Sequence, residues 1–266
     1  MGHEPKASTL NTHNSAMNRV FEEAVARGFL AHKNVPLLVN KGEKSERRPD
    51  FTREEYATMI RKMPSWINAG KPTDMRHLMR DYVLIIANTG MRHGTEALNL
   101  RWKHVTLFEE KDLQYLEMSV TDKTGRRDII CCSGTINYLK RIHERSDDIK
   151  HIPFEDLLKQ RLNLPVFRLP DGTVSKNIHQ TFRKFVTDAG LITCPRTNQN
   201  RTLYSLHHTY ATFALLNGGM DIHALAIQMG TSIDSHLTPR LKKDMLTDKR
   251  SELSRDEFDD QYDTRE

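Results

Sequence analysis

Two short stretches of this 266-residue sequence carry side chains that could do chemistry together. Residues 89–96, TGMRHGTE, place Arg92 just after a glycine, and residues 204–208, YSLHH, place a phenol and two imidazoles where an apolar helical pattern begins. A guanidinium beside the free backbone N–H groups of a helix start is suited to bind phosphate. The alternative is that Arg92 and Glu96 form an ordinary i,i+4 ion pair on the surface.

Lys123 is a third candidate, near the tip of a predicted hairpin. A lysine on a β-turn can reach a substrate placed over the sheet, as a proton donor or a phosphate contact, or it can simply keep the turn soluble. Tyr204 and His207 are three residues apart, so both could point into one site. His207 and His208 cannot share a helical face, and neither H-E-x-x-H, H-x-H nor a cysteine cluster is present. We therefore predict no metal site.

The elements that must position these groups are mostly helical. Glycine or polar stops bound the apolar runs, as expected at helix ends. The predicted helices cover residues 15–30 with a stop at Gly28, 76–88 with a stop at Gly90, 91–100, 134–145, 152–162, and 175–189 between Ser175 and Gly190.

A small antiparallel sheet is expected among these helices. Residues 113–120 and 126–132 are rich in β-formers and are joined by a turn that contains Gly125. Thr52 and Glu55 have the spacing of a capping box, which predicts another helix start. The predicted fold class is therefore α+β, mostly helical.

Composition limits the function classes. At 37% hydrophobic residues the chain can bury a sizeable core, and its net charge of +5 permits a polyanionic partner without requiring one. We find neither an apolar run near the roughly 20 residues of a membrane span nor a signal-peptide pattern. We expect a soluble, cytoplasmic protein whose three cysteines are reduced.

Residues 41–50, KGEKSERRPD, are almost wholly charged and end in proline, which is typical of an exposed linker. Arg47 and Arg48 could bind phosphate from there, or belong to a solvated charge run. The helical segment before this stretch looks too small to fold alone. Four segments are therefore predicted: a partial helical domain at 1–43, a linker at 44–50, the main domain at 51–239 and a charged tail at 240–266.

The two reactive stretches resemble motifs of the tyrosine recombinase (phage integrase) family. The first resembles its first arginine box, through Thr89, Gly90, Arg92, Glu96, Ala97, Leu100 and Trp102. The second, S-L-x-H-T-Y-A-T followed by an apolar helix, Asn-Gly and ALAIQMGTS at 224–232, resembles its second box. The resemblance implies an integrase-type catalytic domain at 51–239, with a small antiparallel sheet, and a remnant of the helical core-binding domain at 1–43.

For function, the resemblance implies site-specific DNA integration and recombination on double-stranded DNA, without a cofactor. In that family two arginines, a lysine and histidine-like groups hold the scissile phosphate while a tyrosine attacks it, leaving a 3′-phosphotyrosyl link and a free 5′ hydroxyl. Cations placed in advance stabilise the transition state more than the ground state. The positions that would carry this role are Arg92, Lys123, Tyr204, His207 and Thr231. The implied DNA contacts are Arg47, Arg48, Arg126, Arg127 and His208, with a homo-oligomer on DNA as a further expectation.

Two departures from the family pattern predict impaired catalysis. His207 stands where the second arginine belongs, and a mostly neutral imidazole with one donor replaces a charged fork, so we expect a loss of at least ~10²- to 10³-fold. The segment that should carry the nucleophile is also absent, because Ile233-Asp234 joins directly to Ser235-His236-Leu237. Tyr262 remains downstream, but neighbouring carboxylates oppose its approach to a phosphate.

Several functions stay open on the sequence. The main prediction is a DNA-binding recombinase with an impaired chemical step, and its alternative is a non-catalytic competitor or regulator that occupies recombination sites. A working recombinase would need Tyr262 or a tyrosine from a partner copy as the nucleophile. A helical DNA-binding regulator unrelated to integrases would need no convergence of Arg92, Lys123, Tyr204 and His207.

Overall fold

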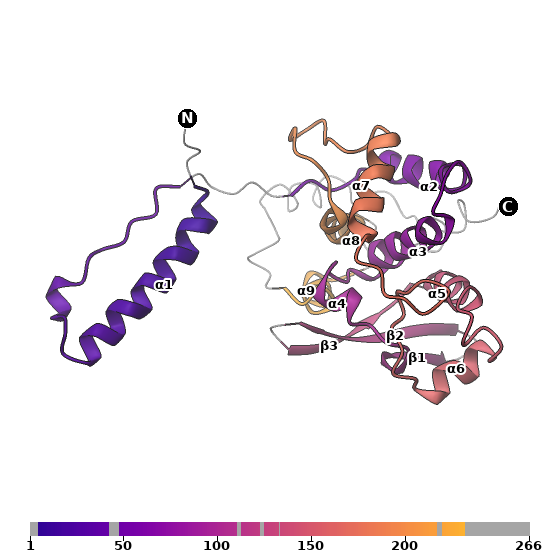
Figure 1. Cartoon of the computed structure of the whole chain (residues 1–266), viewed down its shortest axis with the longest axis horizontal. Helices are drawn as coiled ribbons and strands as arrows, with labels where there is room; N and C mark the ends of the chain where they lie inside the picture. Colours follow the sequence, from indigo (N-terminus) through magenta and orange to yellow (C-terminus); the bar gives the residue numbers. More distant parts are fainter. Residues whose placement is uncertain are drawn as a thin grey trace. The chain divides into compact units, whose positions relative to one another are not determined.

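The chain divides into two compact units, residues 1–47 and 48–266 (Figure 1). The computed structural model describes residues 5–42, 48–110, 113–122, 125–132, 134–216 and 220–231. The predicted tail at 240–266 and the first four residues of the predicted linker lie outside these ranges, as do Lys123, Arg47 and Tyr262.

Unit 1 consists of helix α1 (Ala7–Ala26), the short turn η1 (His32–Asn34) and a returning segment. The amide of Asn40 donates to the carbonyl of Ala7 at 2.8 Å and ties this segment to the start of the helix. The helix begins at Ala7 rather than at residue 15, because its polar first turns carry no apolar signal. None of residues 5–42 is buried, so this part of the chain has no hydrophobic core of its own.

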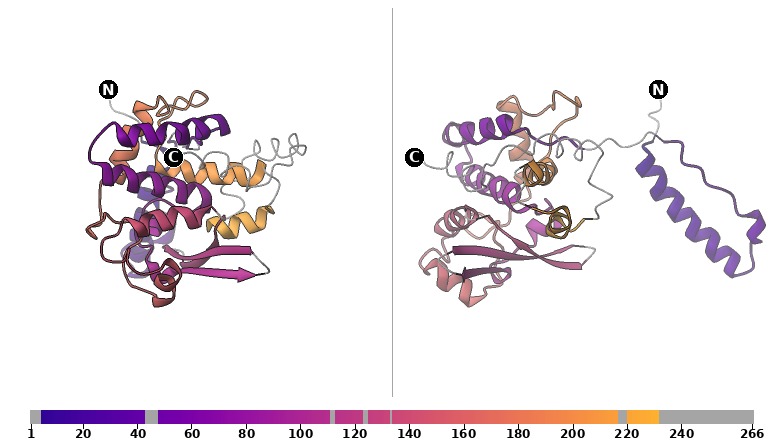
Figure 2. Two further views of the ribbon diagram at one scale, coloured as in Figure 1. Left: turned by 90° about the vertical axis from the view of Figure 1, so that its right-hand side faces the viewer. Right: turned by 180° about the vertical axis from the view of Figure 1, so that it is seen from behind.

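The helices of unit 2 pack around α3 (Thr73–Thr89), which contacts helices on several sides. Its residues Tyr82–Ala87 are all buried, as expected for a helix at the centre of a core. The views in Figure 2 place the longer helices on one side of the sheet. The other helices are α2 (Arg53–Asn68), α4 (Thr95–Leu98), η2 (Trp102–His104), α5 (Thr135–Glu144), α6 (Phe154–Gln160), α7 (Ile178–Asp188), α8 (Leu203–Leu216) and α9 (Ile222–Met229).

The sheet has three antiparallel strands in the order β1 (Val105–Glu110), β2 (Leu113–Asp122) and β3 (Gly125–Ile130). The two β-rich segments of the sequence form β2 and β3, and the α+β fold class is confirmed. Strand β1 was not predicted, because its six residues show no clear turn before β2, and its pairing with β2 defines it. Helix α9 contacts β3, and α6 contacts β1.

The prediction of a helix over residues 91–100 is wrong. Only Thr95–Leu98 is helical, because Gly94 adopts φ 101° and ψ −121°, which no α-helix accommodates. Arg92 therefore lies in a loop between α3 and α4, and side-chain contacts rather than a helix start hold it. The left-handed Gly90 does end α3, as the sequence indicates.

The remaining predicted helices are close to the observed ones. Thr52 and Glu55 form the expected capping box, with Thr52 Oγ1 accepting from Glu55 N–H at 3.2 Å and Glu55 Oε2 accepting from Thr52 N–H at 2.9 Å. Ser175 is not the cap of α7, since the helix begins at Ile178 after Asn177. Its hydroxyl accepts the Asn177 N–H at 3.0 Å, one turn before the helix starts.

The described helices include none that is long and apolar enough to cross a membrane. Cys131, Cys132 and Cys194 form no disulfide with one another. Burial raises the pKa of the Cys131 thiol well above its ordinary value, so this group stays neutral at physiological pH.

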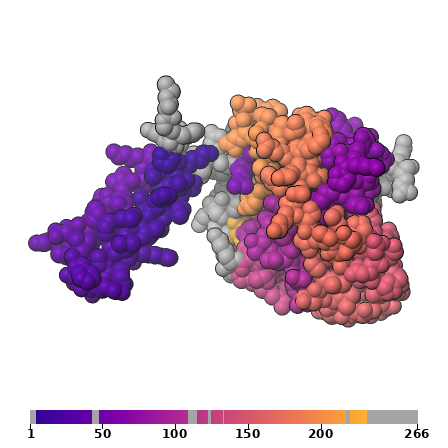
Figure 3. All heavy atoms as spheres, in the orientation of Figure 1, coloured from indigo at the N-terminus to yellow at the C-terminus, as the bar shows by residue number. Residues whose placement is uncertain are grey.

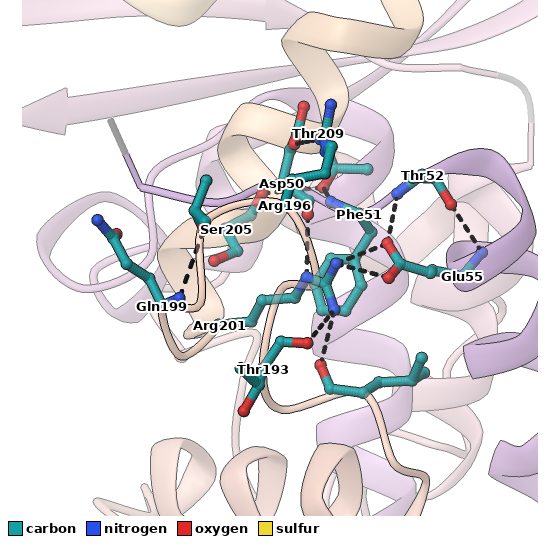
Figure 4. Close-up of polar contacts among 12 residues, drawn as sticks. Asp50, Phe51, Thr52, Glu55, Thr193, Arg196, Gln199, Arg201, Ser205 and Thr209 are labelled. Carbon is teal, nitrogen blue, oxygen red and sulfur yellow. Dashed lines mark hydrogen bonds and ion pairs between the residues drawn. The ribbon is translucent and has the colours of Figure 1, made fainter. Parts of the chain in front are cut away.

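A buried arginine joins the first segment of unit 2 to the chain before α8 (Figure 4). The Arg201 guanidinium is 2% exposed and donates through Nη2 to both carboxylate oxygens of Glu55, at 2.7 and 2.6 Å. Its Nε donates to the carbonyl of Asp50 at 3.0 Å, and its carbon lies 4.7 Å from the centre of the Phe51 ring. Asp50, at the end of the predicted linker, is thereby anchored to unit 2.

Helix α2 adjoins the segment that carries α7 on the surface of unit 2 (Figure 3). The indole N–H of Trp66 donates to Asp188 at 2.8 Å, and its ring packs edge-on against Phe185 with centroids 5.1 Å apart. These contacts join α2 to α7, and both helices also pack against α3.

We expect Arg201→Ala to lower the free energy of unfolding by about 3 to 5 kcal/mol, because it leaves the largely buried Glu55 carboxylate without its cation. Urea unfolding at neutral pH measures this change. The matched control is Arg196→Ala, which removes a 47% exposed arginine that pairs with Asp50 and should cost less than about 1 kcal/mol. Equal losses in the two variants would contradict the assigned role of Arg201.

Candidate functional site

A buried carboxylate, Glu96, lies at the centre of the site and holds two arginines from different elements. Its Oε1 accepts from Arg92 Nη1 at 2.8 Å and from Arg127 Nη1 at 2.5 Å. Its Oε2 accepts from Arg127 Nη2 at 2.7 Å and from the backbone N–H of Arg92 at 2.8 Å. Because the Glu96 side chain is 1% exposed, the Arg92–Glu96 pair is a buried one, which rules out the surface alternative.

The loop that carries Arg92 is also tied to α3 through His93. The Tyr82 hydroxyl lies 2.6 Å from His93 Nδ1. Burial raises the pKa of Tyr82, and burial together with repulsion from His179 lowers the pKa of His93 to about 4. At neutral pH the phenol and the imidazole are therefore both uncharged, and they share one hydrogen bond.

His207, on α8, fixes the start of the same loop. Its ring is fully buried and its Nδ1 lies 2.7 Å from the carbonyl oxygen of Gly90. A carbonyl can only accept, so His207 Nδ1 carries a hydrogen. The imidazole thus joins α8 to the end of α3, two residues before Arg92.

Tyr204 lies against both histidine rings, with centroids 5.2 Å from His207 and 5.1 Å from His208. The guanidinium carbon of Arg48 sits 4.9 Å from the centre of the Tyr204 ring, which is a cation–π distance. An exposed cation is therefore held beside the phenol.

The C-terminal end of α9 closes the site. Arg92 Nη2 donates to the carbonyl of Gly230, and Arg127 Nε donates to the carbonyl of Gln228 at 3.1 Å. The Gln228 amide exchanges two hydrogen bonds with the backbone of Ile130, at 2.7 and 3.1 Å, and so fastens the helix to β3. Thr231 is the residue after Gly230, whose carbonyl accepts the hydrogen bond from Arg92.

The last residue of β2 completes the set. A carboxylate oxygen of Asp122 accepts a hydrogen bond from Arg92 Nη1, beside the contact that Arg92 makes with Glu96. Asp122 is the chain neighbour of Lys123, which lies outside the described residues. The α3–α4 loop, the sheet, α8 and α9 therefore meet around one guanidinium.

The predicted DNA contacts differ in exposure. Arg126 is 70% exposed on β3, where it donates to Ser119 Oγ at 2.7 Å. Arg127 is 12% exposed and turned inward onto Glu96, and His208 is 5% exposed. The charges of Arg48 and Arg126 therefore lie at the surface, whereas the side chains of Arg127 and His208 are largely buried.

Sequence reasoning missed two residues of this site. Gln228 interrupts the otherwise apolar ALAI-Q-M stretch of α9, and this polar residue could have been noticed. Asp122 carries no local signal, since only the folded hairpin brings it to Arg92. Asp122 lies outside both motif stretches, and Gln228 lies within the 224–232 stretch but was given no role there.

Chemically, the site can bind an oxyanion through Arg92, with the hydroxyl and imidazole groups nearby as further hydrogen-bonding partners. Within the described ranges, no group of three or more His, Cys, Asp or Glu side chains could hold a metal ion. The described residues of the site thus offer cation and hydrogen-bond chemistry.

Gly230→Ala tests the packing of Arg127 against α9. An added Cβ would lie 2.6 Å from Arg127 Nη1 at φ +62°, so the guanidinium would have to move away from Glu96. We expect a loss of about 2 to 3 kcal/mol in the free energy of unfolding. Gly190→Ala is the control, because it has φ +74° with nothing within 4 Å and should cost about 1 kcal/mol. Indistinguishable losses would show that this contact does not constrain the site.

The His93 contact should make stability depend on pH. An unfolded imidazole takes up a proton near pH 6.5, whereas folded His93 stays neutral down to about pH 4. The stability from this group is complete above pH 6.5 and is lost as the pH falls toward 4. We expect the free energy of unfolding of His93→Gln to fall less steeply over this interval than that of the wild type. Exposed His223→Gln is the control and should follow the wild-type curve.

Neither a protein-family model nor a curated protein sequence matches the chain. Solved structures do match it in fold. XerH site-specific recombinase bound to palindromic difH substrate, in a post-cleavage complex, superimposes with a TM-score of 0.54 at 19% identity, over 80% of this chain and 56% of that one. This chain thus spans less than two thirds of that recombinase.

Two integrases bound to DNA match over more of their length. The Tn1549 transposon integrase in complex with circular intermediate DNA gives a TM-score of 0.57 at 16% identity, over 91% of this chain and 79% of that one. A lambda integrase dimer bound to a COC′ core site gives 0.51 at 15% identity, over 93% and 80%. This chain has the α+β fold of the tyrosine recombinases.

Proposed function

We propose that the chain binds duplex DNA as a tyrosine recombinase does, with one backbone phosphate held at Arg92, and that strand cleavage and rejoining are impaired. The observation that carries this proposal is the convergence on Arg92 of the α3–α4 loop, Asp122 and Gly230, with His207 fastened to the same loop. A helical regulator of another kind would not need this convergence.

The shared fold supports a DNA partner, because the matching XerH, Tn1549 and lambda structures are complexes with their DNA sites. Charge supports it too. The net charge of +5 and the surface arginines Arg48 and Arg126 favour contact with a phosphate backbone. Lys123 and Arg47 belong to the same proposal as further cations, and Thr231 as a hydroxyl donor beside Arg92.

The proposed impairment rests on His207. Its ring is fully buried and one nitrogen is committed to Gly90, so it does not offer the charged fork that an arginine would bring to a phosphate. A transition state that gains negative charge at phosphorus would lose one of its cations there. The second reason is the sequence around 233–237, which lacks a nucleophilic tyrosine; Tyr262, or a tyrosine from a second copy, would have to serve.

Fluorescence anisotropy with a labelled duplex tests the binding half. Wild-type protein should bind, and Arg92→Gln should bind about tenfold more weakly or worse, because one charge-assisted phosphate contact is lost. The slope of log affinity against log salt should also fall by about one phosphate contact. Arg183→Gln, which removes an exposed charge from α7, is the control and should bind nearly as the wild type does.

The same protein incubated with a nicked suicide duplex tests the impaired half. We expect no covalent protein–DNA adduct on a denaturing gel. An adduct lost in Tyr262→Phe would identify a working recombinase, and one that persists would point to a tyrosine from another position or copy. Absence of duplex binding by the wild type would refute the proposed function altogether.

A further inference from the structure

In this structure the positive charge of the Arg92 guanidinium is already paired with the carboxylate of Asp122. The guanidinium contacts Glu96 and Asp122 through Nη1 and the carbonyl of Gly230 through Nη2. Arg127, the other arginine of the site, forks onto Glu96. The two cations and the two carboxylates cancel, so an approaching phosphate meets a group of side chains with no net charge.

The two carboxylates are not equivalent. Glu96 is 1% exposed and accepts four hydrogen bonds, including one from the backbone of Arg92, so removing it would take the loop apart. Asp122 is 10% exposed and is the last residue of β2, opposite Gly125 across the hairpin. Of the two, Asp122 is therefore the carboxylate that can move away from Arg92 without disrupting the buried contacts of Glu96.

A carboxylate and a phosphodiester compete for the same donors. Both are anions that accept charge-assisted hydrogen bonds from a guanidinium, and both repel each other at short range. If a phosphate is to reach Arg92 as the proposed function requires, the Asp122 carboxylate must move aside. Its pairing energy with Arg92 is then subtracted from the binding energy of the phosphate.

We propose that Asp122 occupies the anion-binding face of Arg92 when no DNA is present, and that it sets the affinity of this site because a backbone phosphate must displace it. The inference rests on the proposed function, since it concerns the same arginine. It adds a residue outside the motif positions and assigns it a role opposite to that of the cations: Asp122 weakens phosphate binding.

Asp122→Asn tests the inference, since the amide keeps the size of the side chain and removes its charge. We expect it to bind a short labelled duplex about three- to tenfold more tightly than the wild type, as the loss of one competing ion pair should allow. Asp122→Glu keeps the charge and should bind no more tightly than the wild type.

The matched control is Asp147→Asn. Asp147 follows α5, is 62% exposed and pairs with Lys150 at 2.7 Å, so its substitution changes the net charge equally without contact to Arg92 or to any proposed DNA contact. Its duplex affinity should change by less than about twofold. In an Arg92→Gln background the gain from Asp122→Asn should disappear, because the two residues act as a pair.

Inorganic phosphate gives a second readout that does not depend on DNA. In thermal melts, added phosphate should raise the Tm of Asp122→Asn more than that of the wild type or of Asp147→Asn. If the asparagine variant does not fold, Asp122→Ser removes the same charge with a smaller side chain and takes its place.

The outcomes separate the two proposals. Duplex binding by the wild type, with Asp122→Asn equal to Asp147→Asn or weaker, would overturn the role of Asp122 and leave the proposed function standing. Duplex binding by none of the proteins, with phosphate protection still greatest in Asp122→Asn, would refute the proposed function and support the role of Asp122. A gain that survives in the Arg92→Gln background would also overturn the inference.

Discussion

The site depends on the charge of one buried carboxylate. Glu96 is almost fully excluded from solvent and would be costly to bury without partners, so Arg92 and Arg127 are held against it by a large electrostatic penalty for leaving. Those two arginines reach onward to the carbonyls of Gly230 and Gln228. A single carboxylate therefore fixes the α3–α4 loop, a strand and the end of α9 in one arrangement.

The loop around Arg92 shows how backbone is held in place where no helix holds it. Gly94 keeps residues 91–94 out of helical geometry, and the anchors are side chains from other elements: Tyr82 on α3 and His207 on α8. Each anchor uses a group kept in its neutral, hydrogen-bonding form or buried beyond the reach of solvent. The guanidinium of Arg92 is thus placed in advance, which reduces the reorganisation that binding of an anion would need.

His207 explains how strand cleavage could be impaired while the fold is kept. A group at this position can either extend toward a phosphate or support the loop from within, and the buried imidazole does the second. The proposed separation of DNA binding from strand cleavage follows from that choice. In the proposed role, Asp122 also weakens the site, because its carboxylate neutralises the Arg92 guanidinium until a backbone phosphate displaces it.

Local patterns were enough to predict the helices of the core, the capping box at Thr52 and Glu55 and the strands β2 and β3, since apolar periodicity and turn residues act over a few positions. The resemblance to the two boxes pointed to Arg92 and His207. Tertiary structure alone decided that Val105–Glu110 is a strand, that Arg127 turns inward and that Asp122 reaches Arg92. The two ion pairs join residues 31 and 30 positions apart, and the strand is defined by its pairing with the next one along the chain. An ion pair or a strand pairing of this kind leaves no periodic trace in either of its two segments.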